Sequence, residues 1–145
     1  MRRVEANVTI GAPPDAVFAF VAELDNLPTW QPGVISAEQT SPGAIGVGTT
    51  ARVLRELMGQ RLTVDVSVTA FDPGRRLALE STAAGLSVSA AMDLEPAPEG
   101  TKVVVSTEIR TTSPFLAPLE GMAAGIAQED MTNGLQRLKV AIEGT

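Results

Sequence analysis

The chain begins with an alternation of apolar and polar residues that predicts a β-strand. From Val4 to Ile10 every second residue is apolar, which is the period of a strand with one buried face. Gly11-Ala12-Pro13-Pro14 ends the alternation, and proline is tolerated in the first turn of a helix because its missing N–H would be unpaired there. Apolar residues then recur at helical spacing up to Leu24. A short helix is therefore expected after the first strand.

Two further prolines, Pro28 and Pro32, prevent this helix from continuing. The segment between them contains the only tryptophan of the chain, Trp30. We expect a second, very short helix here, with Trp30 at the bend between the helices and the sheet. Two roles for Trp30 stay open: a gate at the mouth of a cavity, or a wedge that packs the helix pair onto the sheet edge.

The middle of the chain predicts a run of strands. The segment 49–58 is apolar on both faces, so its pattern does not assign an inward face. The other segments alternate and are expected to be half-buried strands. These strands are Val34–Gln39, Leu62–Ala70, 77–82, Leu86–Leu94 and Val103–Ile109. Turns are expected at Met58-Gly59-Gln60, Asp72-Pro73-Gly74, Ala83-Ala84-Gly85 and Pro96 to Gly100.

The last third of the chain changes to a helical period. Ser113 is a plausible N-cap and Pro114 suits the first helical position, while Gly144 suits the end of the helix. The apolar stripe of this helix consists of Leu116, Leu119, Ala123, Ala127, Met131, Leu135, Leu138 and Ile142. Internal glycines such as Gly134 weaken an exposed helix by about 1 kcal/mol each relative to alanine. Packing on the sheet must therefore hold this helix.

This order of elements is typical of an α+β fold. Antiparallel strands with one apolar face follow each other, two short helices follow the first strand, and one long helix is left to cover the inner face of the sheet. The chain has 145 residues and contains no linker or repeat, so we expect one domain over residues 1–145.

Four local motifs occur in an order that identifies a family resemblance. They are Pro14-x-x-Val17-Phe18, Asp25-x-Leu27-Pro28-x-Trp30-x-Pro32-x-Val34, Gly46-x-Gly48-Thr49 and Asp72-Pro73-Gly74-Arg75-Arg76-Leu77. With this order of elements the chain resembles the START-like helix-grip superfamily, specifically its polyketide cyclase/dehydrase and lipid-transport group, SRPBCC. The resemblance implies a curved antiparallel sheet of about six or seven strands around the C-terminal helix. It also implies a cavity for a hydrophobic or amphipathic ligand such as a lipid, quinone or polyketide-like molecule.

Three missing residue types restrict the chemistry. The chain has no cysteine, histidine or tyrosine, so it lacks thiolate chemistry, the commonest general base, the commonest metal ligand and phenolic acids. The resemblance implies that cyclising members often use arginine, histidine, tyrosine or glutamate, and two of these four are absent here. We therefore predict no catalytic residue, no metal site and no cofactor, and leave open whether the protein is an enzyme.

Charge and hydropathy restrict the partners. The net charge is -6 and the basic residues are scattered, whereas nucleic-acid binding usually needs a basic face. We therefore expect no nucleic-acid partner. No window approaches the roughly 20 apolar residues of a membrane span. We expect no integral membrane segment and a cytoplasmic protein, and the oligomeric state stays open.

One flank of the long helix is a candidate cavity lining. Its apolar members are Phe115, Leu119, Met122 and Ile126, spaced at i, i+4, i+7 and i+11. An equally good interpretation is plain core against the short helices. The same spacing continues to Asp130, Asn133 and Arg137, which would either bind the head of an amphipathic ligand or emerge into solvent.

A second candidate is the strand with two apolar faces. Arg52, Arg55 and Glu56 lie on it, and an inward arginine would need an acidic partner or an anionic ligand. The alternative is a solvated strand face. Thr107 lies on an apolar face, where its hydroxyl would meet a ligand or bond to its own backbone. The predicted ligand-binding residues are Trp30, Leu54, Arg55, Val64, Val66, Val88, Met92, Thr107, Phe115, Leu119, Met122 and Ile126.

The predicted function is binding of a hydrophobic or amphipathic small molecule between the sheet and the C-terminal helix. One alternative is a cyclase- or aromatase-like enzyme that acts mainly by orienting its substrate, with Arg55, Glu56, Asp130 or Arg137 supplying the proton chemistry. A second alternative is a protein-interaction module without a ligand.

Overall fold

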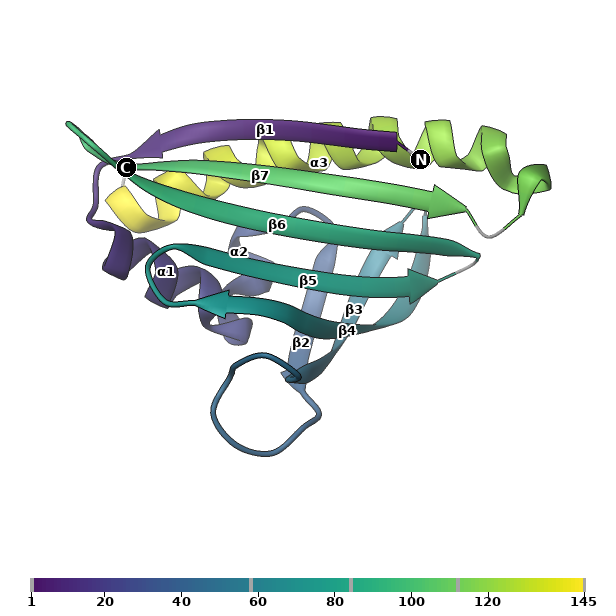
Figure 1. The fold of residues 1–145 in the computed structure, drawn as a ribbon, viewed down its shortest axis with the longest axis horizontal. Coiled ribbons are helices and arrows are strands. Elements are labelled where there is room, and N and C mark those ends of the chain that lie inside the picture. The colour runs from purple at the N-terminus through teal and green to yellow at the C-terminus, as the bar shows by residue number, and fades with distance from the viewer. Residues whose placement is uncertain (1, 58, 84, 112, 145) are drawn as a thin grey trace.

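Seven antiparallel strands form one curved sheet in the computed structural model, which describes residues 2–57, 59–83, 85–111 and 113–144 (Figure 1). Their spatial order is β1-β7-β6-β5-β4-β3-β2. The strands are β1 (Arg2–Ile10), β2 (Val34–Gln39), β3 (Thr50–Leu57), β4 (Gln60–Asp72), β5 (Arg76–Ala83), β6 (Leu86–Ala97) and β7 (Gly100–Thr111). The predicted α+β helix-grip fold is therefore confirmed.

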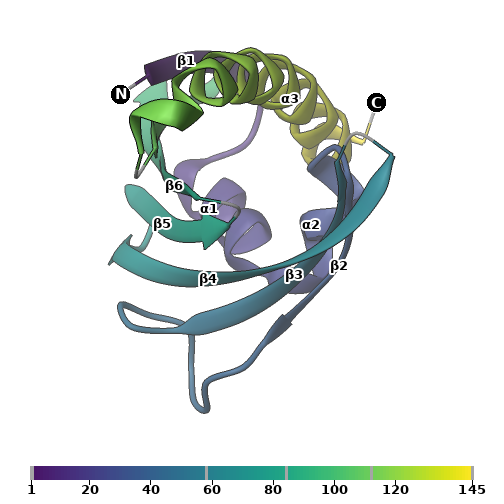
Figure 2. The same cartoon turned by 90° about the vertical axis from the view of Figure 1, so that its right-hand side faces the viewer.

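Short helices close one end of the sheet, and a long helix crosses it. The helix α1 (Pro14–Ala22), the 3-10 turn η1 (Leu24–Asn26) and α2 (Leu27–Trp30) follow β1, as the prolines predicted. The long helix α3 (Ala117–Glu143) packs against β1, β7 and α2. Viewed end-on, the sheet curves away from β1 and around the space below α3 (Figure 2).

The start of the long helix differs from the prediction. The Ser113 side chain accepts a hydrogen bond from the Phe115 N–H, so it does act as a cap. The turn that it caps is the 3-10 turn η2 (Pro114–Leu116), and α3 itself begins only at Ala117. At the other end, Gly144 adopts the left-handed conformation (φ 77°) expected of a helix stop.

The loop between β6 and β7 is also shorter than predicted. Both strands continue through the expected loop, and Pro96 pairs with Thr101. The neighbouring strand β5 reaches β6 only as far as the Arg76–Asp93 pair, so no strand needs the missing N–H of Pro96. Met58 and Ala84, which the sequence places in the turns after β3 and β5, lie outside the described residues.

The core is filled at the end of the sheet that α1 covers. Val17 and Val21 of α1 are buried with Val103 and Leu94 of the sheet. The Phe18 ring also meets the Phe71 ring edge-on at a centroid distance of 5.2 Å. A site for a ligand must therefore lie toward the opposite end, beyond α1.

Candidate functional site

The register of the sheet decides which side of β3 faces inward. Val53 and Ala51 are buried and pair with Val64 and Val66 of β4, so this set forms the inner face. Arg55 lies two residues beyond Val53 and therefore shares that face. The charged side chain of Arg55 thus points inward from β3 and reaches α3.

Leu54 lies on the other side of the sheet. It pairs with Ser36 and Thr63, and both of these residues are exposed. The prediction that Leu54 lines the space under α3 is therefore wrong. The pattern could not resolve this, because β3 carries apolar residues on both faces and only the pairing with β2 and β4 separates them.

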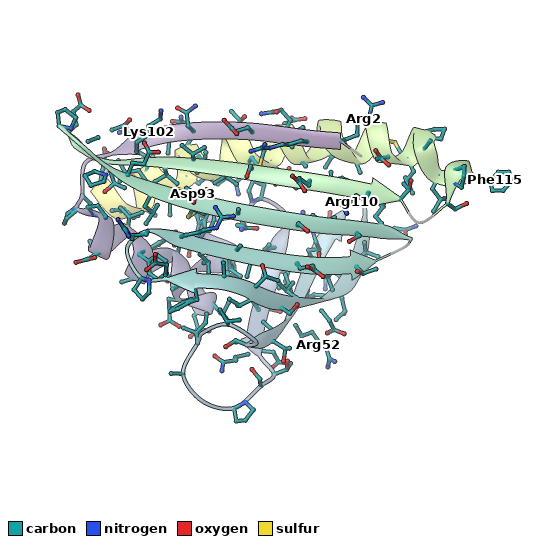
Figure 3. The ribbon with its side chains drawn as sticks, in the orientation of Figure 1. Arg2, Arg52, Asp93, Lys102, Arg110 and Phe115 are labelled. Carbon is teal, nitrogen blue, oxygen red and sulfur yellow. The ribbon has the colours of Figure 1, made fainter. Side chains whose placement is uncertain are left out.

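Two residues of the predicted helix flank also lie outside. Phe115 is 93% exposed and projects beyond the end of the sheet (Figure 3). Met122 is 47% exposed. Their predicted place in a cavity lining is wrong, because Phe115 projects from η2 past the end of the sheet and Met122 lies on an exposed face of α3.

The other half of the flank does face the sheet. Leu119 and Ile126 are half-buried, and Ile126 lies one helical turn before Asp130. Asp130 contacts Arg55 on the inner face of β3, so this stripe of α3 points toward β3. Asn133, which continues the predicted flank, is exposed.

The long helix α3 leaves the inner faces of β3 to β6 without close helix contacts. The helix packs on β1 and β7, and its backbone makes at most sparse contacts with β3 to β6. Several inner-face apolar side chains of these strands are only half-buried, whereas Val103 and Leu94 near α1 are buried. We call the space between α3 and the strands β3 to β6 the hollow. Its inner-face members with partial exposure are Leu62, Val64, Val66, Leu79, Val88 and Ala90.

Two predicted lining residues are instead part of the filled core. Met92 is 7% exposed and belongs to the buried cluster near α1. Thr107 is 6% exposed, and its hydroxyl donates a hydrogen bond to Met131 Sδ on α3 at 3.1 Å. The Thr107 hydroxyl therefore neither bonds to its own backbone nor faces an open space. It links β7 to the long helix through a hydrogen bond.

The polar end of the hollow is the pair Arg55–Asp130. Arg55 Nη2 donates to Asp130 Oδ2 at 3.4 Å, and the two side chains are 29% and 34% exposed. Burial raises the pKa of the Asp130 carboxyl, and Glu129 adds to this, while the positive charges of Arg55 and Arg137 oppose it. The pair is joined by this one long contact rather than by a bidentate one, so most N–H groups of the Arg55 guanidinium do not bond to Asp130.

Two buried donors near this pair have no acceptor. Trp30 is 6% exposed, and within the described part of the chain its Nε1 has no hydrogen-bond partner. The same holds for Nε of Arg55. Such groups are rare in folded proteins, because each costs about 1–3 kcal/mol of desolvation. Trp30 is buried beside Gly134 of α3, and it also carries an unsatisfied polar group.

Sequence analysis missed the glycines that bring these residues together. A Cβ on Gly134 would lie 3.2 Å from Pro32 Cδ and 3.4 Å from the Trp30 carbonyl oxygen, so a larger residue would push α2 away from α3 by a few tenths of an ångström. A Cβ on Gly33 would lie 2.9 Å from the Glu56 carbonyl oxygen and 3.6 Å from Arg55 Nη2. A glycine in the middle of a long helix was the available signal, since it carries a propensity cost that some contact must offset.

Other surface features carry less chemistry. Shallow depressions lie on the outer face of β3 and β4, around Arg52 and Asp65, and beside η1. Arg52 and Asp65 already pair with each other in an exposed position. The described residues contain no group of acidic, histidine or cysteine side chains that could hold a metal ion. None of the described helices is long and apolar enough to cross a membrane.

Comparison with known structures places the fold. The structure resembles TTHA0849 from Thermus thermophilus (TM-score 0.81, 23% identity, covering 99% of this chain and 98% of that one). It also resembles Zhui aromatase/cyclase from Streptomyces sp. R1128 (TM-score 0.82, 19% identity, covering 98% and 93%). A third similar structure is Ara h 8.0201 (TM-score 0.79, 24% identity, covering 99% of each chain). At these identities the likeness concerns the fold.

Sequence comparison adds the family. No curated protein matches the chain significantly. The model of the family described as polyketide cyclase/dehydrase and lipid transport matches residues 1–143, nearly the whole length. The match agrees with the strand order, the position of α3 and the motifs around Trp30. The chain therefore belongs to the polyketide cyclase/dehydrase and lipid transport family.

Proposed function

We propose that this protein binds one hydrophobic or amphipathic small molecule in the hollow between α3 and the strands β3 to β6. The observation that carries this proposal is the partial exposure of inner-face apolar residues such as Val64, Val66 and Val88. An apolar surface that water can reach costs about 25 cal/mol per Å² relative to the same surface covered by an apolar ligand. The family description and the fold relatives support the same role.

Native mass spectrometry of the purified protein tests this proposal. We expect a species heavier than the chain by the mass of one apolar molecule, which organic extraction releases and identifies. Titration calorimetry of the extracted protein with fatty acids, quinones and aromatic ketones then measures binding directly. A protein that carries no such molecule and binds no member of this panel would refute the proposal.

A second candidate function, cyclisation of a polyketide-like substrate, is favoured by the ionisable pair in the hollow. Asp130 has a raised pKa and lies beside Arg55, so it is placed to move a proton while Arg55 orients a carbonyl oxygen. One structural neighbour is Zhui aromatase/cyclase from Streptomyces sp. R1128. Incubation with a linear poly-β-ketone thioester distinguishes the functions. An enzyme changes the product distribution and loses this effect on Asp130→Asn, whereas a binding protein leaves the uncatalysed distribution unchanged.

A further inference from the structure

An apolar tip projects from the end of the molecule that lies away from α1. It consists of η2 and the first turns of α3, and its exposed residues between positions 114 and 122 are all apolar: Pro114, Phe115, Ala117, Pro118 and Met122. Phe115 is 93% exposed and Met122 is 47% exposed. Figure 3 shows Phe115 extending beyond the end of the sheet. Projecting apolar residues that lie together mark a surface that binds a partner.

The exposed face of the tip carries no charge of its own. Pro118 and Met122 are one helical turn apart and share the uncovered face of α3, whereas Glu120 is buried on the other side. Glu120 is the one charged residue between positions 111 and 128. Its carboxylate accepts hydrogen bonds from the N–H and the hydroxyl of Thr111, so it is directed into the protein.

The excess charge beside the tip is positive. The guanidinium of Arg2 lies against the tip, because Arg2 Nη2 would be 3.3 Å from a Cβ on Gly121. Arg2 is exposed, and no carboxylate of the described residues pairs with it. The single carboxylate of each of the strands β1 and β7 already faces an arginine of its own strand, Arg3 or Arg110. Arg2 and Arg110 lie at the same end of the molecule as Phe115 (Figure 3).

We propose that this tip docks on a membrane surface that contains anionic lipids. Phe115 and Met122 enter the apolar layer below the head groups, and Arg2 contacts the head groups themselves. An apolar projection beside unpaired cations binds in the interface of a bilayer and does not cross it. This mode agrees with the finding that none of the described helices is long and apolar enough to span a membrane.

A second copy of the chain fits the tip less well than a bilayer does. A stable protein interface buries about 1,200–2,000 Å² and packs an aromatic anchor into a pocket. Of the two shallow depressions on the surface, one is lined in part by Arg52 and Asp65. The other is lined in part by Glu23 and Asp25, so neither offers Phe115 an apolar pocket. Acyl chains are fluid and adapt to a projecting ring without a preformed pocket.

Vesicle flotation with two lipid compositions tests the proposal: phosphatidylcholine alone, and equal parts of phosphatidylcholine and phosphatidylglycerol. We expect the protein to bind the anionic vesicles, and to bind the neutral vesicles about fivefold more weakly, the effect of one arginine at an anionic surface. Phe115→Ser should weaken binding to the anionic vesicles by about tenfold or more, because it removes the main inserted side chain. Val140→Ser is the matched control, since Val140 is 54% exposed at the other end of the same helix, and it should leave binding unchanged.

A charge variant separates the role of Arg2 from that of the apolar residues. Arg2→Gln should remove the preference for anionic over neutral vesicles and leave binding to neutral vesicles unchanged. Arg75→Gln makes the same change of charge in the exposed turn beside Asp15 of α1, and the preference should persist.

A dye reports which part of the helix enters the bilayer. The chain has no cysteine, so Ala117→Cys and Gln136→Cys each accept one environment-sensitive dye at an exposed position. On anionic vesicles the emission from position 117 should shift to shorter wavelength, whereas the emission from position 136 should stay constant.

Several results would overturn the membrane proposal. They are absence of binding to the anionic vesicles, an unchanged affinity in Phe115→Ser, an equal loss in Val140→Ser, or equal shifts of the two dyes. A dimer in sedimentation velocity without lipid that becomes a monomer in Phe115→Ser also overturns it, because the tip then binds a second copy. Phe115 and Met122 lie outside the hollow, so these results leave the proposed function standing, and calorimetry with small ligands tests that function separately.

Discussion

Filling the hollow should abolish binding at little cost in stability. Val88 lies on the inner face of β6, opposite Ile109 and Ser81, and is partly exposed toward the hollow. In Val88→Phe, four added carbons enter space that water already reaches, so we expect no overpacking. Val103, on the inner face of β7, is the matched control because it is fully buried under α1. There the same substitution forces neighbours apart and costs about 1–3 kcal/mol or more.

Thermal unfolding followed by circular dichroism measures the difference. For 145 residues the entropy of unfolding is about 0.3 kcal/mol/K near 60 °C, so 1 kcal/mol shifts Tm by about 3 °C. Val103→Phe should lower Tm by about 3–10 °C or more. Val88→Phe should change it by no more than about 3 °C, and it should weaken the affinity for the tightest ligand among the fatty acids, quinones and aromatic ketones at least tenfold, on the order of 1.4 kcal/mol. If Val88→Phe destabilises the protein as strongly as Val103→Phe, the space at β6 is already filled and the reasoning is refuted.

Three further predictions concern single contacts. Gly100→Ala should lower the free energy of unfolding in urea by at least about 3 kcal/mol, because at φ 143° the added Cβ would lie 2.7 Å from the Ala12 nitrogen. Gly59→Ala is the control: at φ 79° in open space it should lower the free energy of unfolding by only about 1–2 kcal/mol. Hydrogen bonds from Lys139 and from the Gly11 N–H hold the pKa of Glu143 below its ordinary value. The ionised Glu143 carboxylate therefore stabilises the fold above the ordinary pKa of glutamate, and this stabilisation is lost as the pH falls. Glu143→Gln should flatten the pH dependence of the urea midpoint between about pH 5 and 3. Arg55→Met should raise the pKa of Asp130 further in a carbon-13 NMR titration, because the guanidinium opposes the effect of burial.

Each of these has a result that would contradict it. Equal costs of Gly100→Ala and Gly59→Ala would mean that β7 does not approach the β1–α1 connection as closely as described. An unchanged pH profile in Glu143→Gln would remove the link between the end of α3 and Gly11. A pKa of Asp130 that falls or stays constant in Arg55→Met, or that rises equally in Arg52→Met, would show that Arg55 does not face it.

The candidate site was predicted only in part, and the reason differs by element. Val64, Val66 and Val88 lie on strands of clean alternation, where the face follows from the pattern alone, and they are half-buried on the inner face. The prediction for Leu54 was wrong because β3 is apolar on both faces, so only its register with β2 and β4 decides which face points inward. The prediction for Phe115 was wrong because helical spacing does not indicate where the strands that would cover the helix end.

The sequence by itself determined the order of the elements and the inner faces of the strands that alternate cleanly, because period-two and helical patterns, prolines at helix starts and glycine turns are local properties of the chain. It also determined that histidine, cysteine and tyrosine chemistry is absent. Only the tertiary structure decided that Arg55 turns inward to Asp130 and that Trp30 and Arg55 keep unpaired donors. These facts depend on contacts between α2, β3 and the middle of α3, which lie far apart in the chain. No local pattern encodes such contacts, because they follow from how the whole sheet curves around one helix.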